Sequence, residues 1–169
     1  MNRALSACLL AAAVALGGCQ TGGKRLSVST VPPAPVRQVD KIDLMLFPPA
    51  PLNWNDDPGL DGFQVQVLFW RLDRKLSVTI DGTLEFLLYE GRCGPEDLAR
   101  RKAFQTWTYK EPELSSFLGR TYVGWAYAMR LGWGRHVPTT RTVTLVARFT
   151  PKDGQTCWSL PAQVAMGAT

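Results

Sequence analysis

Histidine is almost absent from this 169-residue chain, which contains only His136. A single histidine excludes metal sites built on two or three histidines, and a Ser-His-Asp arrangement would depend on that one residue. The sequence also lacks a Gly-x-Ser-x-Gly motif and a glycine loop of the phosphate-binding type. His136 lies in a polar stretch between two expected strands, which is typical of a solvated loop residue. We therefore expect a non-catalytic protein without a cofactor.

The apolar run at residues 4–16 is too short to span a bilayer, which requires roughly 20 apolar residues. Arg3 precedes this run, and Leu16-Gly17-Gly18-Cys19 ends it. This succession resembles the precursor of a bacterial lipoprotein. The resemblance implies a signal peptide over residues 1–18 and acyl chains on Cys19, which would anchor the protein to a membrane without spanning it. The alternative is an ordinary secretory signal, in which Cys19 carries no lipid.

The residue after the expected lipid site is Gln20. In enterobacterial lipoproteins an aspartate at this position favours retention in the inner membrane. By that resemblance, Gln20 implies an outer-membrane lipoprotein that faces the periplasm. The net charge of +5 is a modest excess, which favours anionic envelope polymers or lipid headgroups and does not indicate nucleic acid.

Cysteine is scarce, with four in the chain. Cys8 would leave with the signal peptide and Cys19 would carry lipid, so the folded domain would keep Cys93 and Cys157. Two thiols in an exported chain most simply form a disulfide, which would stabilise the fold by roughly 4 kcal/mol. The alternative, a redox or metal pair, lacks the close Cys-x-x-Cys spacing. We therefore expect a Cys93–Cys157 disulfide.

Period-two alternation of apolar residues dominates the chain after residue 39. The stretches that predict strands are residues 42–47, 63–69, 78–89, 104–109, 123–133, 142–149 and 156–166. Residues 95–102 and 113–118 predict one or two short helices. We expect an all-β, two-sheet antiparallel β-sandwich, transthyretin-like or immunoglobulin-like, over residues 39–169. Residues 19–38 are rich in Pro, Gly and Ser and predict a flexible tether.

Residues 53–62 form the densest polar cluster of the sequence. Hard oxygen ligands of this kind suit calcium, and the candidate ligands are Asn55, Asp56, Asp57 and Asp61. The stretch fails as an EF-hand, because Pro58 displaces the required glycine and Gln64 stands where the closing glutamate belongs. The alternative is a turn stabilised by Asx hydrogen bonds and proline. We therefore expect no metal site, and these four residues are the candidate ligands of the calcium-binding alternative.

Six tryptophans offer aromatic surfaces. Trp125 and Trp133 lie on the apolar face of an expected strand, which favours a role in the core. Trp54, Trp70 and Trp158 lie near the ends of strands and are candidates for exposed contact surfaces. A surface of this kind could stack on a glycan, which gives a glycan-binding sandwich as an alternative function.

Four stretches carry a family resemblance: Ile42-Asp43-Leu44-Met45-Leu46, Pro51-Leu52-Asn53, Gly62-Phe63-Gln64-Val65-Gln66-Val67-Leu68-Phe69-Trp70-Arg71-Leu72 and Tyr122-Val123-Gly124-Trp125-Ala126-Tyr127-Ala128-Met129-Arg130. They resemble the outer-membrane lipoprotein family of type VI secretion systems. The resemblance implies a transthyretin-like sandwich that binds an inner-membrane partner. The chain departs from the family pattern where Trp54 replaces a proline, and Cys93 and Cys157 do not belong to it.

A second resemblance, through Leu52-Asn53-Trp54, Pro58-Gly59, Asp61-Gly62 and Gly82-Thr83-Leu84-Glu85-Phe86, links the chain to uncharacterised β-sandwich lipoproteins. This resemblance implies the fold and leaves the function open. The residues expected to contact a partner are Asn53, Trp54, Asp57 and Asp61.

The sequence as a whole predicts an outer-membrane-anchored periplasmic lipoprotein whose sandwich is a non-catalytic protein-interaction module. The expected partners are the bilayer, through the acylated N-terminus, and another envelope protein. The alternatives are the type VI secretion role and a calcium- or glycan-binding sandwich.

Overall fold

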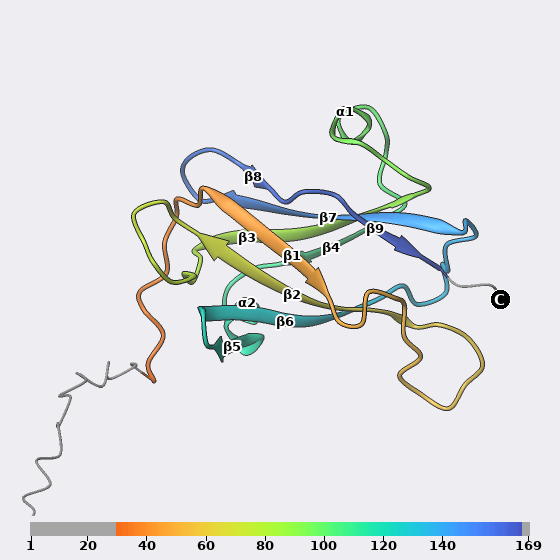
Figure 1. The fold of residues 1–169 in the computed structure, drawn as a ribbon, viewed down its shortest axis with the longest axis horizontal. Coiled ribbons are helices and arrows are strands. Elements are labelled where there is room, and N and C mark those ends of the chain that lie inside the picture. The colour runs from red at the N-terminus through yellow and green to blue at the C-terminus, as the bar shows by residue number, and fades with distance from the viewer. Residues whose placement is uncertain (1–29, 167–169) are drawn as a thin grey trace, which may run out of the picture. The chain divides into compact units, whose positions relative to one another are not determined.

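Two antiparallel β-sheets pack face to face in the computed structural model, which describes residues 30–166 (Figure 1). Among these residues the helices are two segments of four residues each. The predicted all-β two-sheet sandwich with one or two short helices is confirmed. The expected signal peptide over residues 1–18, the lipid site Cys19 and much of the expected tether lie outside the described residues. Between residues 30 and 166, no helix has both the length and the apolar character needed to cross a membrane.

The first sheet has the strand order β1-β2-β6-β5. Its strands are β1 (Lys41–Leu46), β2 (Gly62–Trp70), β5 (Leu118–Thr121) and β6 (Gly124–Gly132). Ile42 lies opposite Phe69 across the β1–β2 pair, and Val65 lies opposite Met129 across the β2–β6 pair. The two outer strands of this sheet are therefore β1 and β5.

The second sheet has β3 and β7 at its centre, with β4 beside β3 and both β8 and β9 beside β7. Its strands are β3 (Gly82–Glu90), β4 (Gln105–Tyr109), β7 (Thr142–Pro151), β8 (Cys157–Trp158) and β9 (Ala162–Ala165). Pro161 lies between β8 and β9, where the expected strand over residues 156–166 is interrupted because proline cannot donate to a ladder.

The alternation that predicted the strands places most of their apolar side chains in a core between the sheets. On β2, Phe63, Val65, Val67 and Phe69 are buried, whereas Gln64 on the other face is exposed. The Phe69 ring meets Tyr127 of its own sheet and Phe149 of the opposite sheet, each at a centroid distance of 5.7 Å and in edge-to-face geometry. Such edge-to-face pairs add to the stabilisation from burial alone.

The predicted helix over residues 95–102 is shorter in the structure, where α1 spans only Pro95–Leu98. The basic run that follows leaves the helix, and the Arg101 guanidinium instead donates to the Cys93 Sγ at 2.9 Å and to the Glu90 carbonyl at 2.7 Å. Helices of this length are stable only when an apolar face packs against the protein. Residues 100–102 offer no such face.

The other helical segment, α2 (Glu113–Ser116), lies inside the stretch that predicted it. The sequence did not predict β5, which follows at Leu118–Thr121 and pairs with β6. Its four residues include Gly119 and Arg120 and show no long alternating pattern. β5 is therefore defined by its neighbour rather than by its own sequence.

Residues 33–40, called the strap below, are attached to the sandwich. The Val36 N–H donates to the Thr79 carbonyl, and the Asp81 N–H donates to the Val36 carbonyl, both at 2.8 Å. The Thr79 hydroxyl donates to the Pro33 carbonyl at 2.9 Å. The prediction that residues 19–38 are all tether is therefore wrong at its C-terminal end, because Val36 packs against the core and holds the extended chain in place.

Replacement of Tyr127 tests the buried hydrogen bond that links the first sheet to the segment before β3. The Tyr127 hydroxyl accepts from the Ile80 N–H at 3.0 Å, and burial raises the pKa of Tyr127 to about 12. Tyr127→Phe leaves this N–H buried without a partner, so we expect the free energy of unfolding to fall by about 1–3 kcal/mol. Urea unfolding at pH 7 measures the loss. Tyr122→Phe is the control, because Tyr122 is 97% exposed; equal losses in both variants would contradict the prediction.

Candidate functional site

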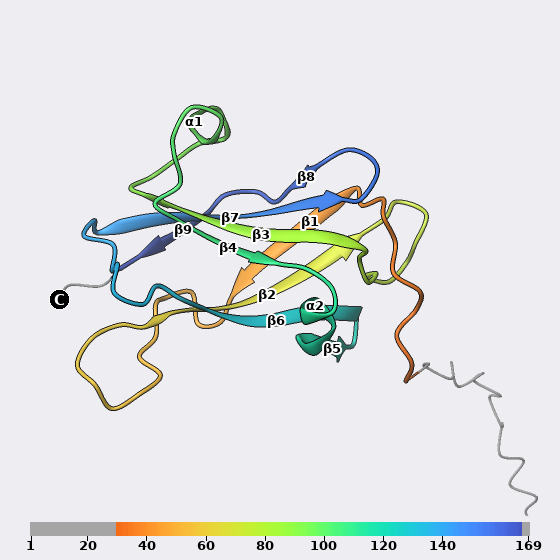
Figure 2. The same ribbon diagram turned by 180° about the vertical axis from the view of Figure 1, so that it is seen from behind.

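The polar loop before β2 lies at the opposite end of the sandwich from the strap, as both ribbon views show (Figures 1 and 2). Two Asx hydrogen bonds shape it. The Asn53 Oδ1 accepts from the Asn55 N–H at 2.9 Å, and the Asn55 Oδ1 accepts from the Asp57 N–H at 2.8 Å. The Asn53 side-chain amide also donates to the Asp57 carbonyl at 2.7 Å. The turn stabilised by Asx hydrogen bonds, one of the two sequence interpretations, is what the structure contains.

Asp61 closes this loop at its base. Its Oδ2 accepts from the Trp54 N–H at 2.6 Å, and its Oδ1 accepts from the Asn55 side-chain amide at 3.4 Å. The Trp54 ring lies against Gly62 and Gly132, where a Cβ on either glycine would meet it. The Arg130 guanidinium lies 5.7 Å from the centre of that ring. Trp54 is therefore a half-buried part of the loop base rather than a free contact surface.

The four residues predicted to contact a partner thus have different surroundings. Asn53, Trp54 and Asp61 are engaged within the loop, and Asp57 is exposed. Of the candidate calcium ligands, Asn55 and Asp61 lie together, whereas Asp56 and Asp57 are exposed. In the part of the chain that the structure describes, no three His, Cys, Asp or Glu side chains are grouped as a metal site would require.

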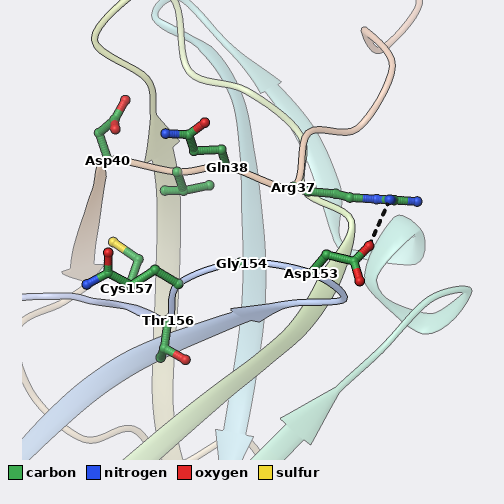
Figure 3. A pocket seen from close by; sticks show the side chains of 9 residues that line it. Arg37, Gln38, Asp40, Asp153, Gly154, Thr156 and Cys157 are labelled. Atoms are coloured by element: carbon green, nitrogen blue, oxygen red, sulfur yellow. Dashed lines mark hydrogen bonds and ion pairs between the residues drawn. The ribbon is translucent and has the colours of Figure 1, made fainter.

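A cavity of about 650 Å³ lies between the strap and the turn that joins β7 to β8 (Figure 3). The Arg37 guanidinium bridges the carboxylates of Asp81 and Asp153, at 3.1 Å each, and the Lys152 ammonium lies 2.7 Å from Asp81. Lys152 and then Arg37 hold the pKa of Asp81 below its usual range. This ionic attachment of the strap is therefore present above that range and weakens as the pH falls through the lowered pKa.

Cys157 lines the same cavity. Burial raises the pKa of its thiol, and the nearby Asp40 carboxylate acts in the same direction. A raised pKa keeps the thiol protonated near pH 7, which makes it a poor nucleophile. His136, the possible general base, is exposed in the loop between β6 and β7, as predicted, and does not line this cavity.

The predicted Cys93–Cys157 disulfide is wrong for this fold, because both cysteines are unpaired. Cys157 lies opposite Phe149 near one end of β7. The Cys93 N–H donates to the hydroxyl of Thr144, near the other end of that strand. Five residues of strand correspond to about 17 Å, whereas the Cα atoms of a disulfide lie about 4.4–6.8 Å apart. The number of cysteines suggested a disulfide, but the two cysteines lie near opposite ends of β7.

A second hollow is a groove of about 610 Å³ between α1 and the segment after β8. Its walls are formed by Pro95, Leu98, Ala99, Trp158, Leu160 and Pro161. Leu160 is 79% exposed and Trp158 is 43% exposed, so both side chains are available at the surface. We call this surface the Trp158 groove.

Arg148 forms the charged part of the Trp158 groove. Its guanidinium lies 2.7 Å from the Glu85 carboxylate and 5.2 Å from the centre of the Trp158 ring. The ion pair neutralises the charge, and the cation-π contact holds the indole in place. A rigid indole beside exposed leucine and proline side chains is suited to binding another apolar surface.

Sequence reasoning found only part of this groove. Trp158 was a candidate for surface contact, but α1 was not connected with it, because about 60 residues separate the two walls. Trp133 is buried in the core as predicted. The signal that was available in the sequence is the alternation of Trp158 and Leu160 around Ser159, just before Pro161.

Asp61→Ala separates a structural role of the loop from a metal-binding role. With EDTA present, we expect the variant to lose about 1–2 kcal/mol of stability, because the Trp54 N–H loses its acceptor. Asp57→Ala is the control and should change stability by less than about 0.5 kcal/mol, since its side chain is exposed. Thermal and urea unfolding measure both. Stabilisation of the native chain by calcium that both variants abolish would instead establish the metal-binding alternative.

Comparison of the chain with protein-family models, with curated proteins and with solved structures gives no match. The resemblance to the type VI secretion lipoproteins therefore stays a prediction from the four short stretches that carry it.

Proposed function

We propose that this chain is an outer-membrane lipoprotein, anchored through lipid on Cys19 and facing the periplasm, whose β-sandwich binds another envelope protein through the Trp158 groove. The role is non-catalytic and needs no cofactor beyond the covalent lipid. The N-terminal motif supports the anchoring, and the exposed apolar groove supports the binding. The groove is the observation that carries the proposal.

An apolar surface of this kind favours a protein partner on energetic grounds. Burial of apolar area contributes about 25 cal/mol per Å², and tryptophan is among the residues that dominate binding energies at interfaces. Trp158 is already held against Arg148, so little side-chain entropy remains to be lost when a partner binds. The groove therefore combines exposed apolar area with a pre-organised anchor residue.

The charges of the groove walls limit the kind of partner segment that can bind there. Arg148 pairs with Glu85, and the remaining wall residues of the groove are uncharged. A strongly charged segment would gain nothing from this surface and would lose hydration on entering it. The partner segment is therefore an apolar one, such as a turn or short strand with leucine, valine or aromatic side chains.

The polar loop is a weaker binding surface for a partner protein than the groove. Its main side-chain acceptors are already used by its own backbone, so a partner would have to compete with hydrogen bonds that exist. We therefore assign the main binding role to the groove. In the type VI secretion role predicted from the resemblance, the bound protein would be an inner-membrane partner.

Cys19→Ser tests the anchor. We expect the precursor to remain unprocessed and to leave the membrane fraction, because the thioether to lipid needs the cysteine sulfur and an unlipidated chain has no acyl anchor. Fractionation of cells and mass spectrometry of the N-terminus measure the result. Cys157→Ser is the matched control and should stay at the membrane. Membrane retention of Cys19→Ser would show that something other than this lipid holds the protein.

A photo-crosslinking amino acid at Ala99, an exposed residue of the groove wall, tests the groove in living cells. We expect one specific protein adduct, which Trp158→Ala reduces about fivefold or more, as expected for removal of an anchor residue. The same photo-reactive residue at Leu72 is the control, since Leu72 is 92% exposed and lies outside the groove. Equal adducts from both positions, or an adduct that ignores Trp158→Ala, would contradict the proposal. Adducts with glycan alone would favour the glycan-binding alternative.

A further inference from the structure

β1 is an edge strand, and one of its two sides has no strand hydrogen-bonded to it. Among the described residues its ladder runs only to β2. The Phe47 N–H donates to the Gln64 carbonyl, directly opposite, which fixes the phase of the pairing. Because paired residues alternate along an antiparallel ladder, the backbone groups of Ile42, Leu44 and Leu46 point to the open side. The backbone N–H and C=O groups of these three alternate residues thus have no partner strand.

The core side chains of the same strand are incompletely covered. Leu44 and Leu46 pack against the core but are only half-buried. Their neighbours on β2, Val65 and Val67, are almost fully buried, at 1% and 0% exposure. The core is therefore closed along β2 and left open along β1. A further strand with apolar residues facing inward would complete it.

The other edge strands differ from β1. β5 has four residues and includes Gly119, and β4 presents Thr106 and Thr108 on its outer face. β9 also has four residues. β1 has six residues, and none of them is proline. Unprotected edges of this kind are templates for pairing with another strand.

We propose that the open edge of β1 pairs with β1 of a second copy of this chain, in an antiparallel two-fold dimer centred on Leu44. In this register Leu44 lies opposite Leu44 of the second copy, and Ile42 lies opposite Leu46 of the second copy. All the backbone groups that point to the open side find partners. The inward rows of the two copies meet and extend one core across the pair.

The side chains of the outer face support this register. Lys41 and Asp43 form an ion pair on that face, at 2.8 Å. In the proposed register Asp43 faces Met45 of the second copy, so no like charges are opposite each other. A shift of the centre to Asp43 would place two aspartates opposite each other, which is unfavourable. Charge therefore disfavours the register centred on Asp43, and a register centred on Met45 would place Ile42 opposite Pro48, which has no N–H to donate.

A hollow of about 450 Å³ borders this edge and provides space for the second copy. Leu68, Trp70 and Tyr122 line it on the outer side of the sheet. Phe47 is 51% exposed at the end of β1. In the dimer, Phe47 of the second copy lies opposite Lys41, on the face where Trp70 stands. Each copy thus contributes an exposed aromatic ring to the hollow of the other.

Disulfide crosslinking in native membranes tests the dimer. Asp43→Cys and Met45→Cys are placed in two differently tagged full-length chains that are expressed together. Their Cα atoms would be about 4.5 Å apart in the dimer, a distance that a disulfide accepts. We expect a covalent dimer that carries both tags. The unsubstituted chain, which keeps Cys93 and Cys157, is the blank, and Thr106→Cys with Thr108→Cys on β4 is the matched control.

Two further variants separate loss of pairing from loss of folding. Leu44→Pro removes an N–H that points to the open side and leaves the β1–β2 ladder intact, and Phe47→Ala removes only an exposed ring. We expect each to reduce the crosslink about fivefold or more while circular dichroism shows the native fold. Absence of the 43–45 crosslink, equal crosslinking of the β4 control, or an adduct with a different protein at this edge would each overturn the proposal.

Discussion

The contact of Phe69 with Tyr127 and Phe149 decides which face of each sheet is inside. Side chains alternate between the two faces of a strand, so fixing one inward residue fixes the orientation of all the others. Since Phe69 enters the core, Leu68 and Trp70 emerge on the outer face of the first sheet. On the second sheet, Phe149 enters the core and Arg148 emerges beside Trp158. The outer faces that carry Trp70 and Trp158 are consequences of this one arrangement.

The outer faces are covered unequally, and this difference separates the groove from the loop. α1 covers part of the outer face of the second sheet and stops after one turn, so Trp158 and Leu160 stay exposed beside it. The polar loop, in contrast, satisfies its own hydrogen bonds around Asp61. A hydrogen bond exchanged between loop and partner gives little net energy, whereas apolar area removed from water gives a gain for every square ångström. The groove is the stronger binding surface for that reason.

Local patterns predicted the strands, because alternation depends only on neighbouring residues, as in Phe63, Val65 and Val67. The features that sequence reasoning missed depend on contacts between distant segments. Val36 docks on residues 79–81, and Leu160 lines one groove with α1. The two cysteines follow the same logic: counting thiols suggests a pair, but only the register along β7 reveals their separation. The sequence predicted one wall of the candidate site, through Trp158. The other wall, α1, could be identified only from the fold.

An open edge and a lipid anchor have a physical connection. A strand with unpaired backbone groups invites aggregation in solution, where any exposed strand can pair with it. If Cys19 carries lipid, copies of the chain share one membrane plane, and their effective concentration rises without any new contact. A short interface along Ile42, Leu44 and Leu46 would then be sufficient for pairing, although it would be weak between untethered molecules. The edge of β1 is tolerable in a protein whose copies meet in one plane and occupy that edge themselves.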